Sequence, residues 1–285
     1  MTIEKLKNFC YLARLHKPAG LFLIWPMLWA LWLAGEGHPN GEIVIIFILG
    51  AIIMRSAGCV INDISDRRFD AHVSRTCQRP LVTKKISTKE AFCFFAILLS
   101  CAFSLVLYLN QFTIMLAFAG VIFAVIYPLM KRFTYLPQLG LGVAFSWGVP
   151  MAFAAQNNII LVNDWIVFFA AVIWPVIYDT FYAMIDRPED LKIGVKSTAI
   201  LFGAHDKTII AMLQILFLGV LGKVGYLFHL HVFYYLGLVI VSVLFIYQQL
   251  LIRSNNTNNY YKAFVSNHWV GLVIFLGIVT NYCFY

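Results

Sequence analysis

The sequence has little charge. Only 12% of its 285 residues are Asp, Glu, Lys or Arg, and 61% are hydrophobic. Because a soluble domain carries roughly 25% charged residues, this composition excludes an ordinary soluble protein and indicates a protein embedded in a membrane. The formal net charge of +8 fits Lys and Arg gathered in cytoplasmic loops, and nucleic-acid binding is not needed to explain it.

Sequence features of several other protein classes are also missing. The six cysteines form no CxxC pair or other metal-ligand spacing, and most lie in apolar runs, where Cys behaves as a small hydrophobe. The first twenty residues lack the apolar core and cleavage site of a signal peptide, so we expect a short amphipathic helix over about 1–17. Without low-complexity segments or linkers, the chain reads as one transmembrane domain over 1–285.

Long apolar runs dominate the chain instead. A membrane-spanning helix needs about 20 mostly apolar residues, and nine segments meet that length. They are 18–35, 43–63, 88–108, 112–130, 137–156, 163–185, 209–228, 231–251 and 268–284. The predicted fold is therefore all-α, a polytopic bundle of nine transmembrane helices.

The basic residues predict the orientation of this bundle. If the spans alternate in direction, 19 of the 21 Lys and Arg residues fall on the side of the N-terminus. The connections on the other side, near 36–42, 109–111, 157–162 and 229–230, contain none. Because basic residues collect in cytoplasmic loops, we expect a cytoplasmic N-terminus and an external C-terminus.

Acidic and amide side chains gather where the second span leaves the membrane, in "VINDISDRRFD" at 60–70. In a helix, Asn62, Asp66 and Asp70 would share one stripe, with Asp63 at its edge and Arg55 two turns deeper. Oxygen ligands without nearby His or Cys suit Mg²⁺, which commonly bridges to phosphate oxygens. A solvated charge cluster at a helix exit is the alternative interpretation.

A second acidic cluster, Asp179, Asp186 and Asp190, ends the sixth span. Pro188 disfavours helix at the residue before it, so we expect a helix break between Asp186 and Asp190. Alternating topology places both clusters on the cytoplasmic side, where acids ringed by Arg and Lys suggest a magnesium–diphosphate site. Asp179 and Arg55 lie deeper, where an ionisable group costs roughly 3 kcal/mol and is a functional candidate by default.

Four motifs carry a family resemblance. They are N-D-x-x-D-x-x-x-D at 62–70, "RTCQRPL" at 75–81, "YPLMK" at 127–131 and D-x-x-x-D at 186–190. With these, the chain resembles the UbiA superfamily of intramembrane aromatic prenyltransferases over about residues 10–284. "YDTFYAMIDR" and "KIGVKSTAILFG" resemble the bacterial subgroup that prenylates 4-hydroxybenzoate.

The resemblance implies nine helices around a central cavity, with polar cap loops on the cytoplasmic side. It implies a Mg²⁺-dependent transfer of a polyprenyl group from polyprenyl diphosphate to the ring of 4-hydroxybenzoate, ortho to the hydroxyl. This reaction belongs to ubiquinone biosynthesis in the bacterial inner membrane. No nucleic acid or obligate protein partner is implied.

The resemblance also assigns roles to residues. The metal ligands would be Asn62, Asp66, Asp186 and Asp190, with Asp70 in support. Asp66, Asp186 and Asp190 would also be catalytic. Tyr127 would approach the leaving group. The diphosphate would be bound by a set of basic residues: Arg67, Arg68, Arg75, Arg79, Lys131 (also counted as catalytic) and Lys192. Arg55 would anchor the carboxylate of the acceptor, and Asp63 and Asp179 are further candidates for substrate binding.

Two alternatives remain at this stage. A transporter would use intramembrane Asp for ions, with carboxylates near the midplane along a path open to both sides. A related prenyltransferase would use another acceptor, such as homogentisate, dihydroxynaphthoate or haem. Arg55 favours a carboxylated acceptor but does not choose among them.

Overall fold

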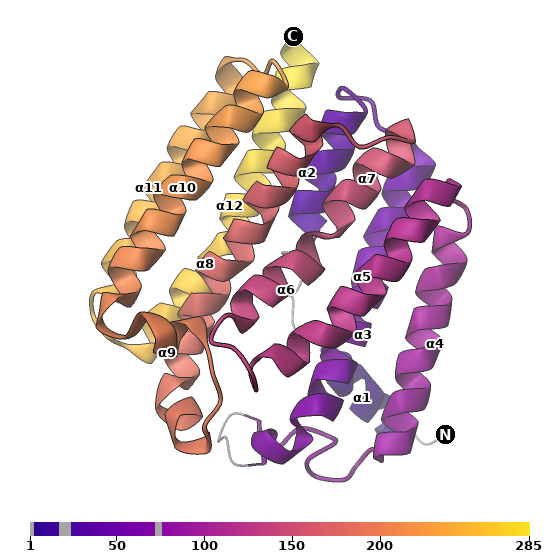
Figure 1. The fold of residues 1–285 in the computed structure, drawn as a ribbon, viewed down its shortest axis with the longest axis vertical. Coiled ribbons are helices and arrows are strands. Elements are labelled where there is room, and N and C mark those ends of the chain that lie inside the picture. The colour runs from indigo at the N-terminus through magenta and orange to yellow at the C-terminus, as the bar shows by residue number, and fades with distance from the viewer. Residues whose placement is uncertain (1–2, 17–23, 72–75) are drawn as a thin grey trace.

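In the computed structural model, the described residues are 3–16, 24–71 and 76–285, with the backbone alone described at Arg68. All regular elements within these residues are helices (Figure 1), which confirms the predicted all-α fold. Their bounds are α1 Ile3–Leu12, α2 Ile24–Ala34, α3 Gly41–Asp70, α4 Thr88–Val106, α5 Gln111–Met130, α6 Pro137–Ser146, α7 Gly148–Asn157, α8 Val162–Ile193, α9 Thr198–Phe202, η2 Gly203–His205, α10 Asp206–Leu227, α11 Val232–Ile252 and α12 Thr257–Phe284.

Eight helical segments in the described part of the chain are long and apolar enough to cross a membrane. Two of these segments are composite, because α6 continues into α7 and α9 continues into α10. The apolar α2 is shorter, and the first part of its predicted span, residues 18–23, lies outside the described residues. With α2 as the ninth span, the helices match the nine predicted ones.

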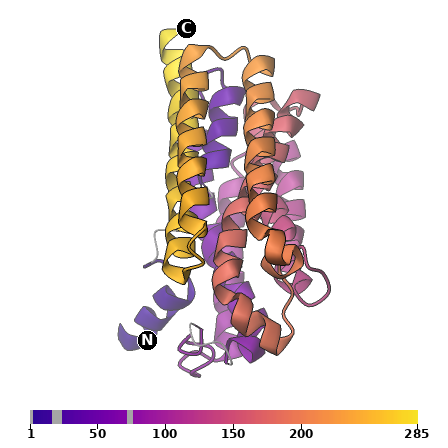
Figure 2. The ribbon, with the colours of Figure 1, turned by 90° about the vertical axis from the view of Figure 1, so that its left-hand side faces the viewer.

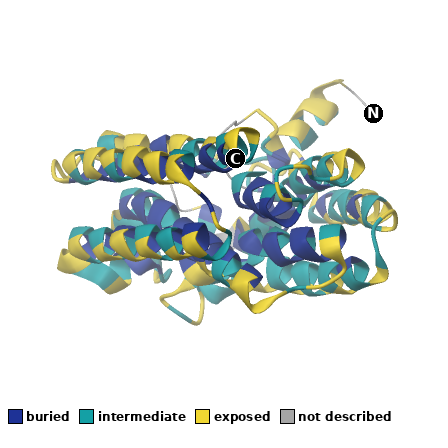
Figure 3. Cartoon of the chain, turned by 90° about the horizontal axis from the view of Figure 1, so that it is seen from above, coloured by how far each residue is buried: buried dark blue, intermediate teal, exposed yellow. Residues whose placement is uncertain are grey.

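The spans form a closed ring. Each one packs against the next along the chain, and α12 returns to contact α2. Figures 1 and 2 show the long helices running roughly parallel, with the two termini at opposite ends of the molecule. Seen from above, the buried residues face the inside of the ring and the exposed residues face outward (Figure 3).

Aromatic side chains join α2, α8 and α12 where the ring closes. Trp29 Nε1 donates a hydrogen bond to the carbonyl of Gly271 at 3.0 Å, and Trp174 Nε1 donates to Asn267 Oδ1 at 3.1 Å. The rings of Trp29 and Trp174 lie 5.4 Å apart. Gly271 sits so close to Trp25 and Trp174 that a Cβ would clash with both rings. These contacts satisfy polar groups that would otherwise be costly in an apolar interior.

Helices α3 and α8 are longer than the membrane requires. They have 30 and 32 residues, so at about 1.5 Å per residue each extends about 45 Å. The hydrocarbon core is only about 30 Å thick. Each helix therefore projects beyond the apolar core, and the C-terminal turns of both carry the acidic clusters.

The predicted break at Pro188 is wrong. Helix α8 continues through Pro188 to Ile193 and ends at Gly194, whose φ of 73° is in the left-handed region that glycine tolerates. A proline removes one backbone donor, but neighbouring groups or water can satisfy the carbonyl that it leaves, so a long helix can continue. Asp186 and Asp190 therefore share one helical face.

Helix α12 also differs from its predicted bounds. It begins at Thr257 and is capped by Asn256, whose side chain accepts a hydrogen bond from the Asn258 backbone at 2.8 Å. The expected span began only at 268, because the preceding residues are polar. Hydropathy locates the part of a helix inside the membrane and not the whole helix.

Topology is the first prediction. A reporter fused after Tyr285 should be external, because the ring contains an odd number of spans and the basic loops lie at the end opposite the C-terminus. The matched control is a fusion after Ser254, in the connection between α11 and α12, where the reporter should be cytoplasmic. Cytoplasmic activity of the Tyr285 fusion would contradict the predicted orientation.

Candidate functional site

A polar cavity of about 830 Å³ lies among the ends of the helices that carry the acidic clusters. Its walls come from the N-terminal segment, α3, the connection before α4, α5, α6, α8, the connection after α8, and α12. Among the described residues, the lining includes equal numbers of acidic and basic side chains. The acids are Asp63, Asp66, Asp70, Asp179, Asp186 and Asp190, and the bases are Arg14, Arg55, Arg79, Lys85, Lys131 and Lys196.

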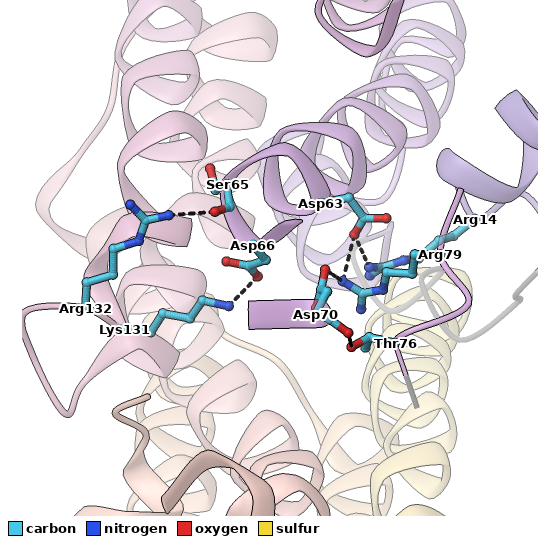
Figure 4. A network of polar contacts seen from close by, with 9 residues as sticks. All are labelled: Arg14, Asp63, Ser65, Asp66, Asp70, Thr76, Arg79, Lys131 and Arg132. Carbon is cyan, nitrogen blue, oxygen red and sulfur yellow. Dashed lines mark hydrogen bonds and ion pairs between the residues drawn. The ribbon is translucent and has the colours of Figure 1, made fainter. Parts of the chain in front are cut away.

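Asp63 joins three segments of the chain (Figure 4). Its carboxylate accepts from Arg14 at 2.6 Å and from Arg79 at 2.9 Å, while Arg79 also bonds Asp70 at 2.6 Å. Arg14 reaches Asp63 from a turn after α1 in which its own φ is 54°. Burial lowers the pKa of Arg14, but Asp63, together with smaller contributions from Cys59, Tyr127 and Tyr182, raises it by more in sum, so the net shift is upward and Arg14 stays charged.

The two carboxylate oxygens of Asp66 differ in their hydrogen-bond partners. Oδ2 is paired with the ammonium group of Lys131 at the end of α5. Oδ1 is buried, and among the described residues it has no hydrogen-bond partner. An ionised buried oxygen without a partner is costly, so Oδ1 is a position where a cation or a ligand donor would be stabilised.

The second acidic cluster faces the same cavity. Asp186 and Asp190 line it from α8, and Asp179 lines it from deeper in the same helix. Gln138 of α6 donates to Asp179 Oδ2 at 3.3 Å and accepts from the Thr198 backbone at 3.0 Å. The connection after α8 is also tied to the end of α5, because the Lys196 backbone donates to the Lys131 carbonyl at 3.0 Å.

Most of the predicted site residues line this one cavity. They are Arg55, Asn62, Asp63, Asp66, Asp70, Arg79, Tyr127, Lys131, Asp179, Asp186 and Asp190. Two predicted diphosphate ligands are not brought to it: Arg67 is exposed and bonds the Thr88 hydroxyl, and Lys192 is exposed. Each is rotated away around its helix from the neighbouring lining aspartate. Arg75 lies outside the described residues, as does the side chain of Arg68.

Sequence reasoning missed several lining residues. Arg14 and His16 follow an N-terminal helix; Arg14 was counted only among the basic residues that predict a cytoplasmic N-terminus, and His16 was given no role. Gln138 could have been predicted from the sequence, because a polar side chain at the start of an apolar span is a functional candidate. In the structure its side chain is buried. Tyr178 and Tyr182 were hidden among the many aromatic residues of the spans.

Metal binding depends on how far these acids converge. Within residues 3–16, 24–71 and 76–285, no three His, Cys, Asp or Glu side chains lie close enough to hold a metal ion by themselves. Mg²⁺ usually keeps several waters and takes one or two carboxylates together with substrate phosphates. The buried Asp66 Oδ1 and the hard oxygen donors of both clusters fit that kind of site.

The fold and the cavity define a class: a polytopic helical membrane protein with a charged cavity at one end, shielded from lipid by its own helices. Residues 23–276 match the UbiA prenyltransferase family. The chain belongs to this family.

Relatives cover nearly the whole chain. The 4-hydroxybenzoate octaprenyltransferase of Hahella chejuensis is 52% identical over 281 residues, which are 98% of this chain and 94% of the relative. The enzyme of the same name from Pseudomonas syringae pv. tomato is 51% identical over 276 residues, 96% of this chain and 93% of the relative.

Two solved structures have the same fold. An apo UbiA homologue from Aeropyrum pernix K1 has a TM-score of 0.78 and 21% identity, covering 90% of this chain and 97% of that one. A UbiA homologue from Archaeoglobus fulgidus bound to GPP and Mg²⁺ has a TM-score of 0.71 and 15% identity, covering 96% of this chain and 99% of that one.

The Asp63 network generates the second prediction. Asp63→Asn should lower the free energy of unfolding by about 3 kcal/mol, because removing one partner of a buried ion pair leaves charge uncompensated. The measurement is the apparent Tm of the purified protein in detergent. Arg67→Gln is the matched control: Arg67 is exposed on the same helix, and its loss should cost less than about 0.5 kcal/mol. Equal Tm values for the two variants would contradict the structural role of Asp63.

Proposed function

We propose that this protein transfers a polyprenyl group from polyprenyl diphosphate to the ring of 4-hydroxybenzoate, as a step of ubiquinone biosynthesis in the bacterial inner membrane. The single observation that supports it most is the polar cavity, in which both acidic motifs and a matched set of basic residues face each other. The relatives that share about half of the sequence and nearly its whole length are named for this acceptor. That agreement favours 4-hydroxybenzoate over homogentisate, dihydroxynaphthoate or haem.

The balance of acidic and basic side chains in the cavity favours a donor diphosphate that binds together with a metal ion. Six acidic and six basic side chains among the described residues line the wall, so an incoming diphosphate needs additional positive charge. Asn62, Asp66, Asp186 and Asp190, with Asp70 beside them, would hold Mg²⁺ there. When bound, Mg²⁺ neutralises the charge that develops on the leaving diphosphate.

Basic residues of the chain complete the donor site. Lys131 and Arg79 lie at the carboxylates of α3 and are positioned to bind phosphate oxygens by charge-assisted hydrogen bonds. The C1–O bond of the donor breaks with its electrons leaving on the diphosphate. The ring carbon ortho to the acceptor hydroxyl then bonds to C1, and that carbon loses its proton.

Aromatic rings surround the place where the allylic carbon would lie. Tyr127 is one helical turn before Lys131 on α5, and its ring is 6.0 Å from the ring of Phe145. Both line the cavity below the phosphate end. Aromatic faces stabilise a nearby cation, and the surrounding helices exclude the water that would otherwise react with it.

Arg55 is placed for the acceptor. It lies on α3 seven residues before Asn62, about 10 Å deeper along the helix, and it lines the same cavity. A guanidinium offers a planar fork that matches a carboxylate. We therefore assign Arg55 to the carboxylate of 4-hydroxybenzoate, with the hydroxylated edge of the ring directed toward C1 of the donor.

The third prediction tests the metal. Asp66→Ala and Asp186→Ala should each lower prenyl transfer roughly 10²-fold or more, as expected when a group that stabilises developing charge is removed. EDTA should abolish transfer by the wild type, and added Mg²⁺ should restore it. Glu42→Ala is the control, because Glu42 is exposed at the other end of α3. Full turnover in EDTA, or in either aspartate variant, would remove the metal–diphosphate site from the proposal.

The fourth prediction separates acceptor from donor binding. Arg55→Lys should raise the KM for 4-hydroxybenzoate roughly 10- to 150-fold, the equivalent of ~1.5–3 kcal/mol for a lost charge-assisted bond. The KM for polyprenyl diphosphate should change little, because Arg55 lies two turns from the phosphate end. Steady-state kinetics with each substrate varied in turn measure both constants. A rise confined to the diphosphate would assign Arg55 to the donor instead.

A further inference from the structure

A second polar cluster lies outside the cavity, where the end of α8 meets the start of α10. Arg187 of α8 donates to Asp206 Oδ2, and the two side chains form an ion pair. Asp206 is the first residue of α10, and its side chain is 7% exposed, whereas that of Arg187 is 26% exposed. Neither belongs to the described residues that line the polar cavity, so the reaction proposed above gives this pair no role.

Arg187 lies between the two acids of the second motif. Asp186 precedes it, and Asp190 follows three residues later. Pro188, the residue after Arg187, has no backbone N–H, so α8 lacks the hydrogen bond that would otherwise reach the carbonyl of Met184. The missing bond belongs to the turn that carries Asp186, one turn before Asp190, and it makes that turn easier to bend. The ion pair is therefore attached where the two acids could most readily move relative to each other.

The carboxylate of Asp206 is itself held in place by the elements around it. Its position at the N-terminus of α10 is favoured by the helix dipole, and its Oδ1 accepts from the Lys207 backbone at 2.6 Å. The Lys207 ammonium group donates to Asn255 Oδ1 at 2.7 Å, and the Tyr260 hydroxyl donates to the same oxygen at 3.2 Å. These bonds join the start of α10 to α12 and to the connection before it, so Arg187 is paired with a carboxylate that is well anchored.

The segment after α8 has a second attachment, on the other side. The Lys196 backbone donates to the Lys131 carbonyl at the end of α5. The last turns of α8 are therefore held against α10 before Asp190 and against α5 after it. Each residue of a helix is turned by about 100° from the one before, so Arg187 points to α10 while Asp186 and Asp190 line the cavity.

We propose that Arg187 and Asp206 are positioning residues for the second acidic motif. Their ion pair holds the end of α8 at the rotation that turns Asp186 and Asp190 toward the cavity, opposite the acids of α3. The inference rests on the proposed function, because it concerns the metal–diphosphate site described there. Metal-binding side chains depend on the groups that orient them, and loss of such a group typically weakens metal binding roughly 10- to 100-fold.

The experiment measures metal binding directly in the purified protein. Mn²⁺ replaces Mg²⁺ as a paramagnetic probe, and its free concentration is read by EPR. A thiolo-diphosphate analogue of the donor, whose C–S bond resists ionisation, occupies the donor site, and a protein-free sample gives the binding of Mn²⁺ to the analogue alone. Asp206→Asn and Arg187→Gln should each weaken Mn²⁺ binding by the protein roughly tenfold. The double variant should bind no more weakly than either single one, because each substitution breaks the same pair.

Steady-state kinetics separate positioning from a general loss of stability. The Mg²⁺ concentration for half-maximal transfer should rise in Asp206→Asn by the same factor as the Mn²⁺ dissociation constant. The KM for 4-hydroxybenzoate should change little, because the proposed acceptor anchor, Arg55, lies on α3 and not on α8. Asp206→Glu and Arg187→Lys keep the two charges and should weaken Mn²⁺ binding less than the neutral variants do. A lower apparent Tm with wild-type Mn²⁺ affinity would mean that the pair only stabilises the fold, which overturns the positioning role.

Lys207→Gln is the matched control. It removes a charge one residue from Asp206 and breaks the bond to Asn255, but it leaves the pair with Arg187 intact. Its Mn²⁺ affinity should equal that of the wild type, and a loss as large as that in Asp206→Asn overturns the proposal. If a neutral variant does not fold, the charge-retaining variant at the same position supplies the comparison. A wild type that binds no Mn²⁺ beyond the protein-free sample overturns the proposed metal–diphosphate site itself.

Discussion

Charges near a membrane must be paired, and here the pairing also holds the site together. The carboxylates of α3 are neutralised by Arg14 from the N-terminal segment, by Arg79 from the connection before α4 and by Lys131 from α5. Each of these contacts fixes a different piece of chain against the end of α3. The cap over the cavity is therefore attached to the bundle by the same groups that line the cavity, because an isolated buried charge would be too costly to retain.

The interior is divided by chemistry rather than by helices. Charged groups occupy the end of the bundle where α3 and α8 outrun the hydrocarbon, and an apolar cavity of about 570 Å³ lies deeper, with Arg55 and Tyr127 at the junction. A donor with an anionic head and a hydrocarbon tail has the same division along its length.

Much of this organisation could be predicted from the sequence because hydropathy and helical periodicity act locally. The spans, the one-sided distribution of basic residues and the stripe from Asn62 to Asp70 follow from spacing alone. The contact of Arg14 with Asp63 could not be predicted, because it depends on a turn with positive φ and joins residues 49 positions apart in the sequence. Pro188 misled the prediction because a local preference was overridden within a long helix. The apolar cavity could not be predicted either, because its size depends on how residues from several helices pack together.

The closure of the ring by α12 sets an order of events during synthesis. The indole of Trp29 in α2 donates to the carbonyl of Gly271 in α12. The indole of Trp174 in α8 likewise donates to Asn267 in α12. Until α12 is in place, Trp29 and Trp174 can contact each other but lack the hydrogen-bond acceptors that Gly271 and Asn267 provide in the finished bundle. Without α12 the ring of described helices would therefore be open between α2 and α11, and the packing of α12 against both encloses the interior.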